Sequence, residues 1–299
     1  MRLRTLALAV AIAAPCGAAP QRAAAQNPDL LMPEESAAKA KQILQQLLQA
    51  LGGPAYVGVR ESVCDGRLAS FDNRGELTGY TQFKDYWRYP DKNRTEYQIK
   101  GNHGALAVLR GDVPMKGGTV IQVYAGEQGW TFDRSGVSEI PASEMTEFQE
   151  QTRTDMDNLM RLRLNEEGMS FRYGGSGVVD LKQVDWVEIV DRERRTFRIA
   201  VDRSAHLPIR AVVVTRNDMT RERTEVVTVY SNYRSVERVE TPMQVAREHD
   251  GRRSFQAFYR DCKYNPGISD ELFARASLEK RYSETASKKD KKKREAEKQ

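Results

Sequence analysis

The sequence predicts a mainly β protein of the α+β type: a curled antiparallel sheet that forms an unclosed β-barrel, with an N-terminal helix and a mid-chain helical lid. From Tyr56 onward, apolar and polar residues alternate along most of the chain, which is typical of half-buried strands. Short segments rich in Gly, Asn, Asp and Pro separate these stretches. Short connections indicate antiparallel neighbours, since parallel strands need long crossovers, and so long a meander has to curl, split or close.

Residues 1–25 have the pattern of a secretory signal peptide. Arg2 and Arg4 precede an apolar run, and small residues follow it up to Ala25. The run is shorter than the ~20 residues that a membrane-spanning helix needs. We therefore expect cleavage after Ala25 and a mature chain in the bacterial periplasm, which makes nucleic acid a poor partner.

Residues 34–51 have the spacing of an amphipathic helix, with apolar side chains at i, i+3, i+4 and i+7. Gly52-Gly53-Pro54 predicts its end, because Gly tolerates a left-handed cap and Pro cannot continue a helix. The alternating pattern beyond it predicts strands near 56–64, 77–89, 94–100, 104–110, 119–125 and 128–133.

A second helix, the lid, is predicted near 143–166. Its acidic residues, which include Glu144, Asp155 and Asp157, are expected to point away from the apolar stripe. Asp250-Gly251 further on is a strong hairpin signal. Both helices have an apolar face, and the concave side of a curled sheet is a surface that can cover it. Strands are predicted to resume near 169–174, 177–181, 184–191, 195–202, 208–216, 223–232, 236–240, 242–249 and 252–263.

Cysteines leave two alternatives open. Cys64 lies near the end of the first predicted strand and Cys262 near the end of the last, so in an oxidising compartment a disulfide would join the chain ends. The alternative is two separate thiols. Neither has a CxxC partner or a nearby His, so no metal or redox site is expected. Lipid attachment at Cys16 is not expected, because Pro15 stands where a lipoprotein signal has a small residue.

Positive charge is concentrated at the C-terminus. The formal net charge is +5, and from Ser287 onward there are seven Lys or Arg and three Asp or Glu. Residues 283–299 are therefore predicted to be a disordered basic tail. It would either contact anionic lipid or cell-wall polymer, or simply be solvated.

No sequence pattern points to catalysis. The three histidines fall in predicted turns, and the chain has no HExxH, phosphate-loop or GxSxG motif. Glu188 and Asp202 would make a glycosidase-like pair only if folding brought them within ~5–10 Å of each other across a cleft. We predict a protein without catalytic residues, cofactor or metal.

Several short motifs, in this order, resemble the LolA-like outer-membrane lipoprotein carrier superfamily, over most of residues 36–276. Each motif is loose alone, and their order carries the resemblance. They are Ala50-Leu51-Gly52-Gly53, Tyr89-Pro90-Asp91-Lys92-Asn93-Arg94-Thr95-Glu96, Gly126-Glu127-Gln128-Gly129-Trp130, Val201-Asp202 to Leu207-Pro208-Ile209-Arg210, Tyr230-Ser231-Asn232-Tyr233-Arg234, and Asn265-Pro266 with Leu272-Phe273.

The resemblance implies one domain, residues 26–282, with a lipid-binding cavity under its lid. The best-known members ferry lipoproteins across the periplasm. Those carriers have an Arg directly before the strand-ending Pro, where it helps to latch the lid. This chain departs from them, since it has Tyr89 at that position and Arg88 one place earlier.

The expected ligand is therefore a lipid or a lipoprotein acyl chain bound by a monomer, with an envelope protein as donor or acceptor. The alternative is a periplasmic scaffold or protein-binding module on the same fold, whose apolar residues simply fill a core. The predicted lining of cavity and lid is aromatic and methionine-rich, and Met adapts to irregular apolar shapes. It comprises Trp87, Val123, Trp130, Phe132, Met145, Phe148, Met156, Leu159, Met160, Trp186 and Phe258.

Overall fold

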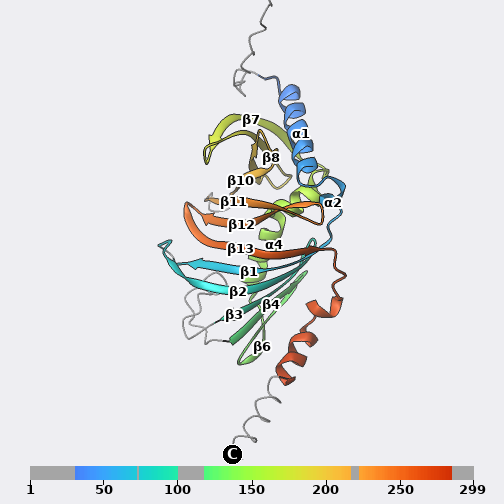
Figure 1. Cartoon of the computed structure of the whole chain (residues 1–299), viewed down its shortest axis with the longest axis vertical. Coiled ribbons are helices and arrows are strands. Elements are labelled where there is room, and N and C mark those ends of the chain that lie inside the picture. The colour runs from blue at the N-terminus through green and yellow to red at the C-terminus, as the bar shows by residue number, and fades with distance from the viewer. Residues whose placement is uncertain (1–30, 73, 100–117, 217–221, 285–299) are drawn as a thin grey trace, which may run out of the picture.

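The computed structural model describes residues 31–72, 74–99, 118–216 and 222–284. Its strands form one antiparallel sheet in the order β6-β5-β4-β3-β2-β1-β13-β12-β11-β10-β9-β8-β7 (Figure 1). The strands are β1 (Glu61–Phe71), β2 (Leu77–Arg88), β3 (Lys92–Ile99), β4 (Gly118–Ala125), β5 (Gln128–Asp133), β6 (Gly136–Glu139), β7 (Ser170–Val179), β8 (Lys182–Val190), β9 (Thr196–Asp202), β10 (Pro208–Arg216), β11 (Arg223–Val236), β12 (Val239–His249) and β13 (Arg252–Tyr264).

The first and last strands of the sheet lie side by side at its centre. β1 pairs with β13, which leaves β6 and β7 as the two edges of the sheet. A twisted open sheet of this width curls, and the strands in Figure 1 wrap around a concave side without closing. The predicted fold class, a curled antiparallel sheet that forms an unclosed barrel, is confirmed.

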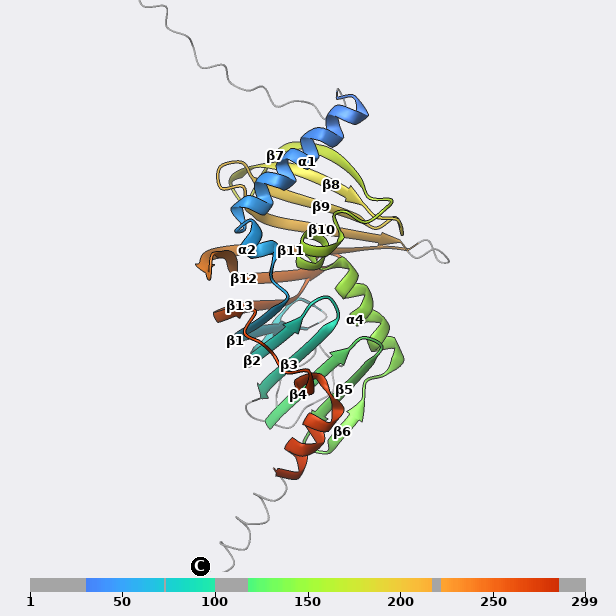
Figure 2. The ribbon, with the colours of Figure 1, turned by 90° about the vertical axis from the view of Figure 1, so that its right-hand side faces the viewer.

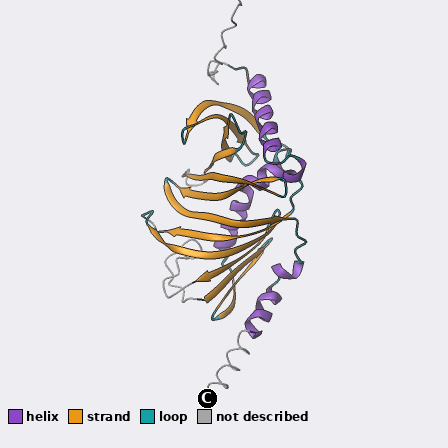
Figure 3. Ribbon diagram, in the orientation of Figure 1, coloured by secondary structure: helices purple, strands orange, loops and turns teal. Residues whose placement is uncertain are grey.

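The helical segments flank the sheet (Figure 3). The N-terminal helix α1 and the lid helix α4 are both found near their predicted positions, and in Figure 2 they lie along one side of the sheet. The helices are α1 (Pro33–Ala50), α2 (Pro54–Val57), α4 (Ala142–Thr154), α5 (Met156–Asn158), the π-helical turn η2 (Leu159–Arg163) and the 3-10 turn η3 (Asp270–Phe273). Residues 275–284 are also helical.

Helix α1 covers the concave face of β7 and β8. Leu47 is fully buried in one cluster with Tyr173 of β7 and Val187 of β8, and the Ser36 hydroxyl accepts a hydrogen bond from the Tyr173 backbone amide at 3.0 Å. The helix ends at Ala50, and the chain turns away at Gly52, where φ is +125° and an added Cβ would lie 2.3 Å from the Arg238 carbonyl oxygen. Only glycine allows this close approach to the β11–β12 turn.

Two strand boundaries differ from the prediction. Residues 54–57 form the short helix α2, because Pro54 suits the first position of a helix, and β1 starts only at Glu61. Residues 236–240 are not a separate strand: β11 continues to Val236, and Glu237 and Arg238, both at positive φ, form the turn into β12. This hairpin was hard to recognise in the sequence, because its tight turn at Glu237 and Arg238 contains no Gly or Asn.

Other predicted segments also change. The strands expected at 169–174 and 177–181 are one strand, β7, with a bulge between Tyr173 and Ser176. Strand β6 and the helix at 275–284 were not predicted. The strand expected at 104–110, the signal peptide at 1–25 and most of the basic tail lie outside the described residues, although residues 283–284 belong to the last helix.

Cys64 and Cys262 form a disulfide with an S–S distance of 2.12 Å. They are directly opposite each other in the β1–β13 pair, 198 residues apart in sequence. The bond therefore joins the two halves of the sheet, β1–β6 and β7–β13, at the pair of strands where they meet.

Candidate ligand-binding site

A row of apolar side chains crosses the concave face of the second half of the sheet. The strand register places Val187, Ile199 and Ala211 opposite one another on β8, β9 and β10, and Ile189, Phe197 and Val213 form a parallel row. All are buried. We call the four residues of β9 and β10, Phe197, Ile199, Ala211 and Val213, the trough.

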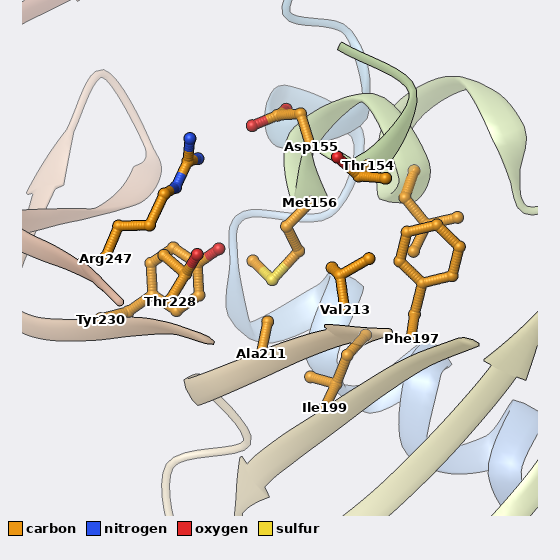
Figure 4. A pocket seen from close by; sticks show the side chains of 11 residues that line it. Thr154, Asp155, Met156, Phe197, Ile199, Ala211, Val213, Thr228, Tyr230 and Arg247 are labelled. Carbon is orange, nitrogen blue, oxygen red and sulfur yellow. The ribbon is translucent and has the colours of Figure 1, made fainter. Parts of the chain in front are cut away.

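Lid residues cover the trough and leave almost no space above it. Met156 and Leu159 line a cavity of about 20 Å³ together with the four trough residues. This volume is about that of one water molecule. Figure 4 shows Met156 pointing toward the trough. The remaining wall is polar and consists of Thr154, Asp155, Thr228, Tyr230 and Arg247. In the closed structure the cavity is therefore too small for an acyl chain.

Half-buried aromatic side chains extend the concave face beyond the trough. Trp87 and Tyr89 stack with ring centroids 5.9 Å apart, and Tyr259 meets Phe83 edge-on at 5.6 Å. Each of Trp87, Tyr89, Tyr230 and Tyr259 retains partial exposure. Even so, burial raises the pKa of the three tyrosines, because the phenolate form loses its hydration there.

At one end, α4 docks on β2, β4 and β5. Phe148 stacks on Tyr124 at a centroid distance of 4.2 Å and on Trp87 at 6.1 Å. The Glu144 carboxylate accepts hydrogen bonds from Tyr124 Oη at 3.0 Å and Gln122 Nε2 at 3.2 Å. Met145 packs directly on Gly129, where a Cβ would come within 2.6 Å of its sulfur.

At the other end, ion pairs tie the lid to the β8–β9 turn. Arg195 donates to Glu150 of α4 at 2.7 Å, and Arg163 of η2 pairs with the buried Asp191 at 3.1 Å. Asp191 also forms an ion pair with Arg195 at 3.2 Å. The lid, residues 142–163, thus spans the concave face from β4 and β5 to the far half of the sheet.

A buried arginine holds the middle of the lid. The Arg161 guanidinium lies between two aromatic rings, 4.4 Å from the centroid of Tyr56 and 4.8 Å from that of Tyr89. It pairs with Asp157 at 3.2 Å, and the Asp157 carboxylate accepts a hydrogen bond from Tyr56 Oη at 2.7 Å. We call Arg161, Asp157, Tyr56 and Tyr89 the latch. Cation–π contacts of this kind are stronger when they are desolvated.

In the carriers that the sequence resembles, the latching arginine precedes the strand-ending Pro; in this chain it lies on the lid. Tyr89 supplies a ring before Pro90, and the arginine comes from the lid. Arg88 instead pairs with Glu61 of β1 at 3.0 Å and contacts Asp270 and the Ile268 carbonyl of the C-terminal segment.

The lid helix is broken at Asp155, which the sequence prediction of one continuous helix missed. Asp155 has extended backbone angles (φ −64°, ψ 134°). Its side chain accepts a hydrogen bond from the Asn158 backbone amide at 3.0 Å and so caps the N-terminus of α5. Asn158 in turn donates to the Pro90 and Thr152 carbonyls. Burial, with a smaller contribution from the Asp157 carboxylate, raises the pKa of Asp155 to about 6. Asp155 therefore faces the cavity, and Glu144 the sheet, contrary to the predicted orientation.

The structure places six of the predicted lining residues, five of them on the lid itself, at the interface between the lid and the concave face. Met145, Phe148 and Trp87 meet at the docking end of α4, where they pack with Tyr124. Met156, Leu159 and Met160 are buried in the large cluster above β7–β10. These two clusters flank the latch, which the sequence analysis did not find because charged lid residues were expected to be solvated.

Val123, Trp130 and Phe132 lie on the opposite, convex face. They pack against Phe273 and Leu278 of the C-terminal segment, which covers that face of β4 and β5. Trp186 belongs to a separate cluster with Ala200 and Ile209, on the other side of β8 from Val187. Phe258 also faces away from the concave side, because its neighbours Ala257 and Tyr259 point into it.

The carboxylates considered for catalysis have structural partners. Glu188 pairs with Arg172 at 3.3 Å on an exposed part of the sheet. The Asp202 carboxylate accepts a hydrogen bond from the Ser204 backbone amide and pairs with Lys182 at 3.0 Å. Burial alone would raise the pKa of Asp202, but these partners lower it. Among the described residues, no group of three or more His, Cys, Asp or Glu side chains is arranged to hold a metal ion. None of the helices in the described part of the chain is long and apolar enough to cross a membrane.

Comparison with known proteins gives structural likenesses only. No family model and no curated protein matches the sequence. The chain is similar to a Vibrio parahaemolyticus domain described as an outer membrane lipoprotein-sorting protein domain (12% identity, TM-score 0.49, covering 81% of this chain and 99% of that chain). It is also similar to a LolA superfamily protein from Nitrosomonas europaea (12%, 0.49, covering 80% and 99%) and to a DUF1329 family protein from Desulfovibrio piger (15%, 0.47, covering 80% and 98%). The Nitrosomonas europaea protein is described as a member of the superfamily whose motifs this sequence resembles.

Proposed function

We propose that this protein is a periplasmic carrier that binds the acyl chain of a lipid or lipoprotein between the trough and the lid, without catalysis. The observation that carries the proposal is the segmented lid, closed over a continuous apolar surface. The lid breaks at Asp155 and continues as a three-residue helix and a π-turn. Irregular helical turns of this type often occur at functional sites.

The energetics suit a ligand that displaces the lid. The closed cavity of about 20 Å³ holds no chain, so Met156 and Leu159 must leave the trough on binding. An acyl chain that takes their place regains ~0.8 kcal/mol per buried methylene. The helix break at Asp155 provides a joint for this movement, and the lid can stay docked at α4 through Phe148 and Glu144.

The test is a pair of variants in the same lid segment. Leu159 is fully buried against the trough, whereas Leu162 of the same π-turn is 38% exposed. With a fluorescent sixteen-carbon fatty acid, Leu159→Asp should tighten binding at least about tenfold, since a buried unpaired carboxylate costs several kcal/mol in the closed state with which the acyl chain competes. Leu162→Asp should change binding less than twofold, and circular dichroism should show both variants folded. Absence of saturable binding to the wild type, or equal effects in both variants, would contradict the proposal.

A second candidate function is a protein-binding module, and the small cavity is the observation that favours it. If side chains permanently fill the concave face, the lid is simply part of the core. Gentle purification from the periplasm followed by native mass spectrometry distinguishes the two. Bound acyl-chain species support the carrier, whereas a bare chain that also fails to take up the fatty acid supports the module.

A further inference from the structure

The apolar rows of the trough lead directly to a cation. Across the sheet, Ile199 on β9 is opposite Ala211 on β10, Ala211 is opposite Thr228 on β11, and Thr228 is opposite Arg247 on β12. Neighbouring strands are ~4.8 Å apart, so Arg247 lies roughly 14 Å from Ile199 along one straight row. Along this row the surface changes from apolar to hydroxyl to guanidinium.

Arg247 has no ionic partner in the described part of the chain. Its Nε is buried without a hydrogen-bond partner, and its guanidinium makes no ion pair or side-chain hydrogen bond with a described residue. Its one ring contact is Phe255, 5.1 Å away. A partly buried guanidinium without a partner is costly, which is reason to expect that a ligand supplies the missing acceptor.

The surroundings of Arg247 suit an anionic group. In Figure 4 it lies beside Tyr230 and Thr228, whose hydroxyl groups line the same cavity. The Asp155 carboxylate of the lid lines the same cavity beyond ion-pair distance, and its electrostatic influence reaches Arg247. Asp155 caps Asn158, so when the segment after Asp155 lifts, the carboxylate turns away with it and Arg247 is left facing the ligand.

We propose that Arg247, with Tyr230 and Thr228, binds the anionic head group of an amphiphile whose chain lies in the trough. This inference rests on the proposed function. It narrows the expected ligand to a fatty acid or lipid that carries a carboxylate or a phosphate. The head group takes the place that Asp155 occupies in the closed state. A charge-assisted contact at one end and methylene burial at the other fix the direction of the chain.

The chain offers a matched control arginine. Arg210 on β10 is also half-buried with an unpartnered buried Nε, but it lies opposite Ala200 on the convex face and pairs with Asp180 at 3.6 Å. Arg210→Gln therefore removes the same charge and the same kind of unpaired group away from the cavity.

The experiment is a titration of the full-length mature protein with three probes of equal chain length: palmitate, hexadecyl phosphate and the neutral monopalmitoylglycerol. Arg247→Gln should weaken binding of the anions about ten- to a hundredfold, the range for a hydrogen bond to a charged group, and leave the neutral probe within twofold. Arg247→Lys should restore part of the preference, and Arg210→Gln should change nothing. Whichever anion binds more tightly identifies a free fatty acid or a phosphorylated lipid as the source.

Two outcomes would overturn the inference, and they can be told apart. If the wild type binds the neutral probe as tightly as the anions, or if Arg247→Gln weakens all three equally, the head-group contact is wrong while the acyl-chain site stands. If the wild type binds none of the probes, the proposed function fails and the inference fails with it. Thermal unfolding of each variant confirms that a loss of binding is not a loss of the fold.

Discussion

Replacing Cys64 and Cys262 together by alanine is expected to lower the free energy of unfolding by about 3–5 kcal/mol. The disulfide closes a loop of 198 residues, and the entropy that a crosslink removes from the unfolded chain grows with loop length. It also lies in the β1–β13 pair, which is the junction of the two halves of the sheet. Urea unfolding of the wild type and the double variant measures the difference.

Reduction provides the control for the disulfide prediction. Wild type unfolded in the presence of a reductant should lose nearly the same stability as the double alanine variant, and the reductant should not affect the variant. A difference below about 1 kcal/mol between oxidised wild type and variant would show that strand pairing alone holds the junction.

Arg161→Leu is expected to release the middle of the lid and to cost about 2–4 kcal/mol of stability. The substitution removes two cation–π contacts and leaves Asp157 with only neutral partners, Tyr56 and Tyr89. Hydrogen exchange should speed up in residues 156–163, while α4, held independently by Phe148 and Glu144, should keep its protection.

Arg153→Leu is the matched control for the latch. Arg153 also belongs to the lid, but it is half exposed and pairs loosely with Glu193 at 3.7 Å. Its loss should cost less than about 1 kcal/mol, as for surface ion pairs, and leave lid exchange unchanged. Equal effects of the two substitutions would mean that Arg161 is not a latch.

The sequence predicted the strands well but not which side of them is concave. Alternation places Val123 and Gln122 on opposite faces of β4, yet either face can be the inner one. The deciding element is the C-terminal segment, in which Phe273 of η3 and Leu278 of the helix at 275–284 cover Val123, Trp130 and Phe132. That helix has only a short apolar stripe, so its pattern was too weak to recognise.

The latch and the lid break were missed for a related reason. Met156, Leu159 and Met160 continue the apolar stripe of Met145 and Phe148, so periodicity alone favours one unbroken helix. Asp155 interrupts the helix because its side chain caps the next helical segment. In the sequence, the only sign of this break is one aspartate. Arg161 is buried because two rings from distant segments enclose it, and such tertiary partners leave no local pattern.

The central claim, that an acyl chain binds on the concave face, is tested most directly with a brominated fatty acid. Bromine quenches tryptophan fluorescence only at close range, and the chain has three tryptophans, of which Trp87 alone faces the lid. If the chain binds there, quenching should be saturable, should persist in the Trp130→Phe/Trp186→Phe variant and should disappear in Trp87→Phe. Quenching that survives in Trp87→Phe and is lost in the double variant would place the chain on the convex face and contradict binding under the lid.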